Sequence, residues 1–107
     1  MISIPQSMQA WVIRGYGGSE TMNLERIAVP QERPGEMLLR VEAASVNPAD
    51  WKTREGLLQA VLPLTFPRVL GRDCVGTVVS LGESCHGFAT GERVLAVADP
   101  LRDGTHA

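Results

Sequence analysis

Val46-Asn47-Pro48-Ala49-Asp50-Trp51 is the stretch from which the organisation of this chain can be worked out. Asn47 suits the N-cap of a helix, and Pro48 suits the first helical position, where its missing N–H costs nothing. Asp50, three residues beyond the cap, favours the positive end of the helix dipole. Because Gly56 can end the helix, the sequence predicts one short helix between Asn47 and Gly56.

Around this helix the sequence predicts short β-strands separated by glycine and proline. Within Glu36–Ser45, Leu39, Val41 and Ala43 alternate with Arg40, Glu42 and Ala44, which is the period of two expected when one face of a strand is buried. The other predicted strands are Gln9–Arg14, Leu24–Val29, Cys74–Leu81 and Glu92–Val97. This pattern favours a mainly antiparallel barrel or sandwich and excludes a helical bundle.

Two glycines are interpreted as architectural. Gly76 lies inside a predicted strand, where a glycine suits a bulge or a close backbone approach. Gly71 lies just before that strand. The glycines of Gly15-Tyr16-Gly17 do not form a dinucleotide fingerprint, because Glu20 occupies the third glycine position, so a hairpin turn is predicted there.

Size and charge narrow the classes of function. The 107 residues suit a single domain, and 44% hydrophobic with 21% charged residues is ordinary for a globular protein. A net charge of -2 with scattered basic residues disfavours nucleic acid as a partner. No apolar run is long enough for a membrane helix, and the N-terminus lacks the pattern of a signal peptide. We therefore expect a cytoplasmic protein.

The two cysteines are weak evidence for either a disulfide or a zinc site. Cys74 and Cys85 could form a disulfide, but nothing indicates an oxidising compartment, and free cysteines are common as small buried hydrophobes. Together with His86 and His106 they are too scattered to predict a zinc site.

Several spaced elements carry a more specific signal. They lie at residues 44–56, 67–78, 82 and 91–94, and in this order they closely resemble the N-terminal GroES-like domain of medium-chain dehydrogenase/reductases. The resemblance is strongest to the zinc-independent quinone oxidoreductase (zeta-crystallin-like) branch and covers about Gln9 to Ala107. It implies a GroES-like, partly open β-barrel with one short helix. Residues 1–107 would be the substrate domain, and the Rossmann cofactor domain would be absent from this chain.

The same resemblance implies that the catalytic zinc is missing. Zinc alcohol dehydrogenases of this superfamily carry Cys where this chain has Asn47, usually His at Pro48, and Gly-His-Glu at Gly71-Arg72-Asp73. An amide is a poor zinc ligand, and a guanidinium has no lone pair to give. The stretch that would hold the structural zinc, after Glu92–Val97, contains no cysteine.

By resemblance, the parent protein uses NADPH or NADH, bound mainly by the missing domain, to reduce a quinone or an activated enone. Asn47 would line the nicotinamide pocket and is a candidate catalytic residue. Lys52, where the branch often has tyrosine, is a second candidate, although a lysine on a short helix is ordinarily solvated. The parent is expected to be a homodimer, and the chain alone is expected to be inactive. The sequence does not choose between NADH and NADPH.

Structural interpretations of the same residues stay open. Asn47 could be only a helix cap, and Asp50 only a first-turn residue. Arg54 is expected to pair with a carboxylate such as Asp73 rather than with a ligand. Trp51 is expected in the core.

Two other functions also remain. The turn-rich tail Ala98–Ala107 favours a free-standing module that binds another protein through open strand edges. A zinc-dependent alcohol dehydrogenase fragment that uses other ligands would instead contain stoichiometric metal.

Overall fold

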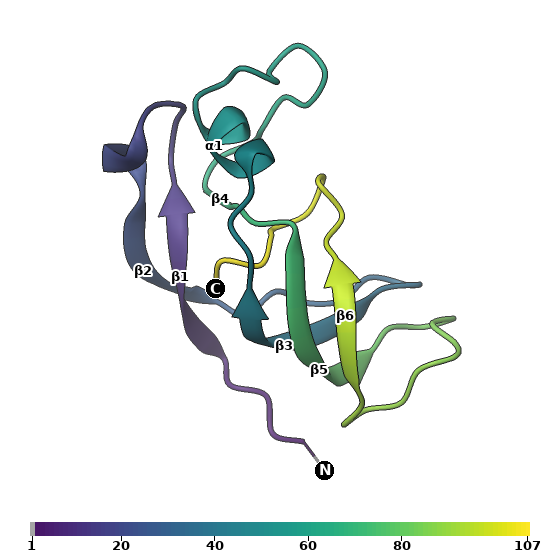
Figure 1. Ribbon diagram of the computed structural model, residues 1–107. Helices are drawn as coiled ribbons and strands as arrows, with labels where there is room; N and C mark the ends of the chain where they lie inside the picture. The colour runs from purple at the N-terminus through teal and green to yellow at the C-terminus, as the bar shows by residue number, and fades with distance from the viewer. Residues whose placement is uncertain (1) are drawn as a thin grey trace.

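Residues 2–107, the part of the chain that the computed structural model describes, form two antiparallel sheets with a short helix at one end (Figure 1). The first sheet has the order β2-β1-β4 and the second the order β3-β5-β6. The strands are β1 (Ser7–Ile13), β2 (Asn23–Ala28), β3 (Met37–Ala44), β4 (Arg68–Val69), β5 (Asp73–Leu81) and β6 (Arg93–Val97). The predicted mainly β, partly open barrel is confirmed.

In the first sheet, β1 and β2 form the predicted hairpin, paired from Ser7 and Ala28 to Val12 and Asn23. The connection includes a 3₁₀ helix, η1 (Ser19–Thr21). The two-residue β4 pairs with the end of β1. Neither η1 nor β4 was predicted, because elements this short leave no periodic pattern in the sequence.

In the second sheet, β5 lies between β3 and β6. Gly76 pairs with Val41, and a Cβ atom at Gly76 would lie 2.9 Å from the main-chain oxygen of Arg40. The predicted close backbone approach is therefore confirmed. The pairing also shifts register between Val41 and Ala43, as in a β-bulge.

This bulge limits the predicted alternation in β3. Leu39 and Val41 are half-buried, but Ala43 is exposed although it was expected on the buried face. The extra residue changes which face the end of the strand presents, so a period of two read from sequence does not hold through it.

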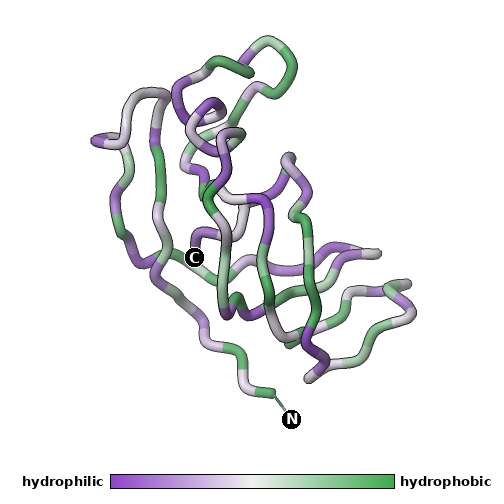
Figure 2. The backbone as a smooth tube through the Cα atoms, in the orientation of Figure 1, coloured by the Kyte–Doolittle hydropathy of each residue, from purple (hydrophilic) through white to green (hydrophobic). Residues whose placement is uncertain are grey.

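The buried core is small. Ala10 and Val12 of β1 pack with Val69 of β4, and Met8 and Ile27 lie against this cluster. Hydrophobic residues also follow the loop after the helix, away from the sheets (Figure 2). Consequently many large apolar side chains stay exposed on residues 2–107.

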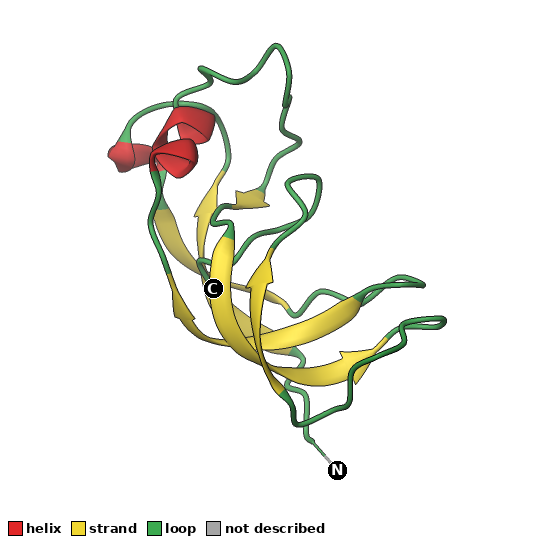
Figure 3. Cartoon of the chain, turned by 45° about the vertical axis from the view of Figure 1, so that its right-hand side comes forward, coloured by secondary structure: helices red, strands yellow, loops and turns green. Residues whose placement is uncertain are grey.

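The helix α1 (Pro48–Arg54) lies at one end of the two sheets (Figure 3). It ends as predicted, with Gly56 at a φ of +84° just beyond Glu55. Its inward residue is Asp50, which is 6% exposed. Trp51 is 41% exposed, so its predicted place in the core was wrong. Successive helix residues turn by about 100°, so with Asp50 facing inward Trp51 faces the edge of the fold.

The tail folds back between the two sheets. Gly104 N–H donates to the Val69 oxygen at 2.8 Å, and His106 N–H donates to the Leu70 oxygen at 2.9 Å. Trp11 N–H donates to the His106 oxygen at 3.0 Å. The tail thus lies beside β4 and the free edge of β1. None of the helices in residues 2–107 has both the length and the apolarity needed to cross a membrane.

Candidate functional site

Asn47 stands at the N-cap position of α1, as predicted, with an extended backbone at φ -125° and ψ 158°. Its side-chain nitrogen donates to the Ser45 hydroxyl and to the Asp73 carboxylate, each at 3.1 Å. Its main-chain N–H donates to the Asp50 carboxylate at 2.7 Å. The carboxamide is therefore held in a fixed orientation by Ser45 and Asp73, and the main chain of Asn47 is held by Asp50.

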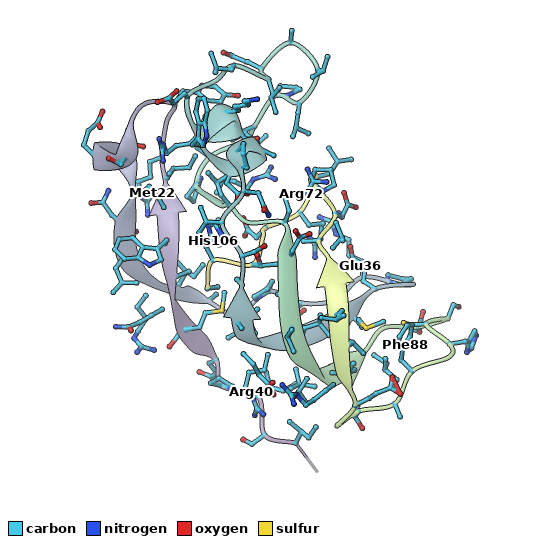
Figure 4. The ribbon with its side chains drawn as sticks, in the orientation of Figure 1. Met22, Glu36, Arg40, Arg72, Phe88 and His106 are labelled. Carbon is cyan, nitrogen blue, oxygen red and sulfur yellow. The ribbon has the colours of Figure 1, made fainter. Side chains whose placement is uncertain are left out.

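Asp50 links the main chain of Asn47 to the tail. The His106 Nε2 atom lies 3.9 Å from the Asp50 carboxylate and 3.1 Å from the main-chain oxygen of Ser45. Ser45, Asn47, Asp50, Asp73 and His106 form what we call the polar cluster. It joins the end of β3, the start of α1, the start of β5 and the tail, and Figure 4 shows His106 between the two sheets.

Gly71 allows the tail to approach this cluster. It has a φ of +106°, which residues with a side chain rarely adopt, and a Cβ atom there would meet the Thr105 hydroxyl and lie 2.9 Å from the His106 nitrogen. The architectural role predicted for Gly71 is therefore confirmed. The Thr105 hydroxyl itself is buried and has no hydrogen-bond partner among residues 2–107.

Arg54 lies near a carboxylate, as predicted, but that carboxylate belongs to Glu55 and not to Asp73. Its Nε donates to the Gly17 oxygen at 3.2 Å, and a terminal nitrogen lies 3.6 Å from the Glu55 carboxylate. Arg54 is at the far end of α1 and reaches the β1–β2 connection, whereas Asp73 lies beside Asn47 at the start of the helix. The length of α1 therefore separates the Arg54 guanidinium from the Asp73 carboxylate.

Lys52 is exposed on α1. Its Nζ atom lies 5.8 Å from the centre of the Trp51 ring, within the range of a cation–π contact. No hydrogen bond or ion pair joins Lys52 to Asn47 among residues 2–107. The catalytic roles suggested for Lys52 and Asn47 remain predictions.

A groove of about 600 Å³ opens between the two sheets beside the polar cluster. Its lining is mostly apolar and comes from β1, β2, β3, α1 and the tail. The lining includes Ala10, Trp11, Val41, Ala43, Trp51 and His106. No pattern in the sequence marked His106 as part of a site, because its partners Ser45 and Asp50 lie far from it along the chain.

A second, much smaller crevice of about 20 Å³ lies below α1. Arg72, Asp50 and Asp99 are among the residues that line it. Arg72 was considered in the sequence only as a residue that cannot bind zinc, so its place at this crevice was not predicted.

The cysteines are both free thiols. Cys74 is buried in β5, and this burial, with a smaller effect of the adjacent Asp73 carboxylate, raises the pKa of its thiol. Over the described residues 2–107, no group of three or more His, Cys, Asp or Glu side chains is arranged to hold a metal ion. At the positions where zinc relatives carry ligands, Asn47 already donates hydrogen bonds to Ser45 and Asp73.

Comparison with known families gives a match over residues 33–106 to the alcohol dehydrogenase GroES-like domain. The chain belongs to this family. The GroES-like domain is 40% identical over 101 residues to a chloroplastic quinone-oxidoreductase homolog of Spinacia oleracea, covering 94% of this chain and 31% of the relative. It is 41% identical over 95 residues to a chloroplastic NADPH-dependent alkenal/one oxidoreductase of Arabidopsis thaliana, covering 88% and 24%.

The fold of this domain is also similar to that of solved structures. The quinone oxidoreductase from Coxiella burnetii superposes with a TM-score of 0.84 at 31% identity, over 94% of this chain and 32% of that one. The GroES-like domain thus spans about a third or less of the length of these relatives. The family predicted from the spaced sequence elements is confirmed, and quinone oxidoreductases are among its relatives, as the resemblance implied.

Proposed function

We propose that this GroES-like domain forms the substrate side of an NAD(P)H-dependent oxidoreductase that reduces quinones or activated enones by hydride transfer. The proposal rests on one observation above all, the Asn47 carboxamide fixed by Ser45 and Asp73 at the start of α1. A fixed polar group costs little reorganisation when a reaction occurs beside it. The relatives named as quinone and alkenal/one oxidoreductases support this substrate class.

The reaction is proposed to need no zinc. Asn47 offers an amide, Pro48 offers no ligand atom, and Arg72 stays protonated, so none of them replaces the Cys or His ligands of a catalytic zinc. Quinones and activated enones suit such a site, because they accept a hydride more readily than simple ketones do.

In this proposal, the domain contacts the nicotinamide ring from the substrate side only. Residues 2–107 contain no strand followed by a glycine-rich helix start, the arrangement that binds a dinucleotide phosphate. A bound nicotinamide would supply the hydride, and the part of Asn47 would be to fix the position of the ring from its substrate side. We therefore propose that a Rossmann domain of the full protein holds NADPH or NADH, and that residues 1–107 alone are inactive. Assembly as a homodimer and residence in the cytoplasm belong to the same proposal.

The full-length protein provides the test. We expect NADPH or NADH oxidation with a quinone or an enone, little with a simple ketone, and at least about a tenfold loss of kcat/KM in Asn47→Ala. Asn23→Ala, in the exposed strand β2, is the control and should keep the activity. NADPH oxidation by residues 1–107 alone would contradict the proposed division between domains. Stoichiometric zinc in elemental analysis would favour a zinc dehydrogenase instead.

A second candidate function follows from the free edge of β1. Trp11 donates its N–H to the tail rather than to β2. Alternate residues of a strand point their amides to the same edge, so the amide of Gln9 also faces the groove. No strand within residues 2–107 pairs with Gln9 there. An edge of this kind can recruit a strand of a second copy of the domain.

A further inference from the structure

Arg72 is the arginine whose position is hardest to explain by the fold. It lies just before β5, and Figure 4 shows it below the loop that follows α1. Its Nε atom is buried and has no hydrogen-bond partner among residues 2–107. None of the ion pairs within those residues includes Arg72. The residue as a whole is half-buried, but a buried N–H donor without a partner is destabilising, which favours a role in binding an acceptor from outside the chain.

The neighbouring Arg68 and Arg102 differ from Arg72 because their guanidiniums form hydrogen bonds and ion pairs within the fold. Arg68 donates to the main-chain oxygens of Thr65, Pro100 and Arg102. Arg102 is 3.1 Å from the Glu36 carboxylate and also donates to the Gln31 oxygen. Both line the same crevice as Arg72. Of the three arginines that line the crevice, Arg72 is therefore the one whose guanidinium makes no hydrogen bond or ion pair within residues 2–107.

The size of the crevice limits what Arg72 can bind. A single water-sized group needs roughly 10–15 Å³, so a crevice of about 20 Å³ admits one oxygen atom. A whole phosphate group is too large to enter, although one of its oxygens is not. A carbonyl or phenolate oxygen can enter while the ring or chain that carries it stays outside.

The charges that line the crevice favour a carbonyl or phenolate oxygen over a phosphate oxygen. The carboxylates of Asp50 and Asp99 line it as well, but each already accepts a main-chain hydrogen bond, from Asn47 and Leu101 respectively. Arg68 and Arg102 also line the crevice, but their guanidiniums are already engaged by main-chain oxygens and by Glu36. Two carboxylates therefore lie near one guanidinium without a partner, which disfavours a doubly charged ligand such as phosphate. A single oxygen with a partial or developing negative charge meets less repulsion.

We propose that Arg72 binds the carbonyl oxygen of the substrate and stabilises the negative charge that this oxygen gains. The substrate class rests on the proposed function. When a hydride adds to carbon, the π electrons of the carbonyl system move to oxygen, and the product is an enolate or phenolate anion. The guanidinium donates hydrogen bonds to that oxygen and keeps its own proton, because arginine does not act as an acid at neutral pH. A proton from water then completes the reduction.

The test uses the 107-residue chain and needs no nicotinamide. The probe is 4-nitrophenolate, which carries one anionic oxygen on a ring, and inorganic phosphate is the second arm. The N–H resonance of the Arg72 Nε is followed by NMR during each titration. We expect a saturable shift with the phenolate, at least about tenfold weaker binding in Arg72→Met, and partial recovery in Arg72→Lys. Arg33→Met is the matched control, since Arg33 is exposed and does not line the crevice.

Three results would overturn the assignment: an Arg72 resonance that does not move with the phenolate, phosphate binding at Arg72 at least as tight as phenolate binding, or unchanged phenolate affinity in Arg72→Met. The Arg72 resonance of the unmodified chain keeps the test decisive if a variant does not fold. Failure here would leave quinone reduction by the full-length protein untouched. Conversely, phenolate binding at Arg72 would stand even if the full-length protein reduced no quinone.

Discussion

Asn47 combines two roles in one side chain, because it holds the N-cap position of α1 and ties Ser45 to Asp73. Asn47→Ala removes both sets of interactions and leaves the partly buried Asp73 carboxylate without that donor. We expect the free energy of unfolding to fall by about 1–2 kcal/mol in urea denaturation. In Asn23→Ala, where the side chain makes one exposed hydrogen bond, the change should stay within about 0.5 kcal/mol. Equal effects of the two substitutions would contradict the role of Asn47.

Glu42 provides a prediction on pH. The Thr77 hydroxyl, which donates to its carboxylate at 2.8 Å, is the main reason that the pKa of Glu42 lies below its usual value. Desolvation acts in the opposite direction, and the nearby Arg93 lowers the pKa further. A lowered pKa in the folded state means that the carboxylate stabilises the fold above the ordinary carboxyl pKa, roughly 4. This contribution is lost as the pH falls through the lower pKa of the folded state.

The measurement compares the unmodified chain with Glu42→Gln in urea denaturation at several pH values. Near neutral pH we expect the variant to be less stable, by a small amount because the ion pair with Arg93 is exposed. The two stabilities should converge below about pH 4. A difference that stays constant, or grows as the pH falls, would contradict this interpretation.

At the scale of the elements, the pairing of β3 with β5 depends on the missing side chain of Gly76. A Cβ atom there would lie 2.9 Å from the main-chain oxygen of Arg40, which cannot move without disturbing the strand pair. We expect Gly76→Val to lower the free energy of unfolding by about 2 kcal/mol or more, despite the higher strand propensity of valine. Gly15→Ala is the control, since nothing lies within 4 Å of a Cβ atom at Gly15. A neutral effect of Gly76→Val would show that β3 can shift away.

At the scale of the whole molecule, the open groove between the sheets should control self-association. Trp11 lines this groove and is 47% exposed. It lies next to Gln9, with which no strand of residues 2–107 pairs on the side away from β2. If a second copy adds a strand there, sedimentation velocity should show assembly that increases with concentration. Trp11→Lys places a charge in the groove and should weaken this assembly at least about tenfold. Leu101→Lys, at an exposed apolar residue outside the groove, is the control.

A chain that remains a monomer over the whole concentration range would rule out the strand-edge candidate. The oxidoreductase proposal does not depend on this result, because its evidence comes from Asn47 and from the relatives. Sedimentation and activity thus separate the two functions.

The sequence predicted the parts of this domain that depend on neighbouring residues. The strand periods, the N-cap at Asn47 and the helix end at Gly56 all involve residues within a few positions of one another. The close approach at Gly76 was also predicted, because a glycine weakens a strand interior unless a bulge or a neighbouring backbone requires it. The ordered set of these local features was enough to predict the family.

Only the tertiary structure decided which side chains meet. Asn47 and Asp73 are 26 positions apart, and Ser45 and His106 are 61 apart, so their contacts depend on the path of the whole chain. The same path turns Trp51 outward and leaves the buried Nε of Arg72 without a partner among residues 2–107. Local propensities act over one or two turns of chain, whereas burial and hydrogen-bond partners are set by elements that pack together after long loops have closed.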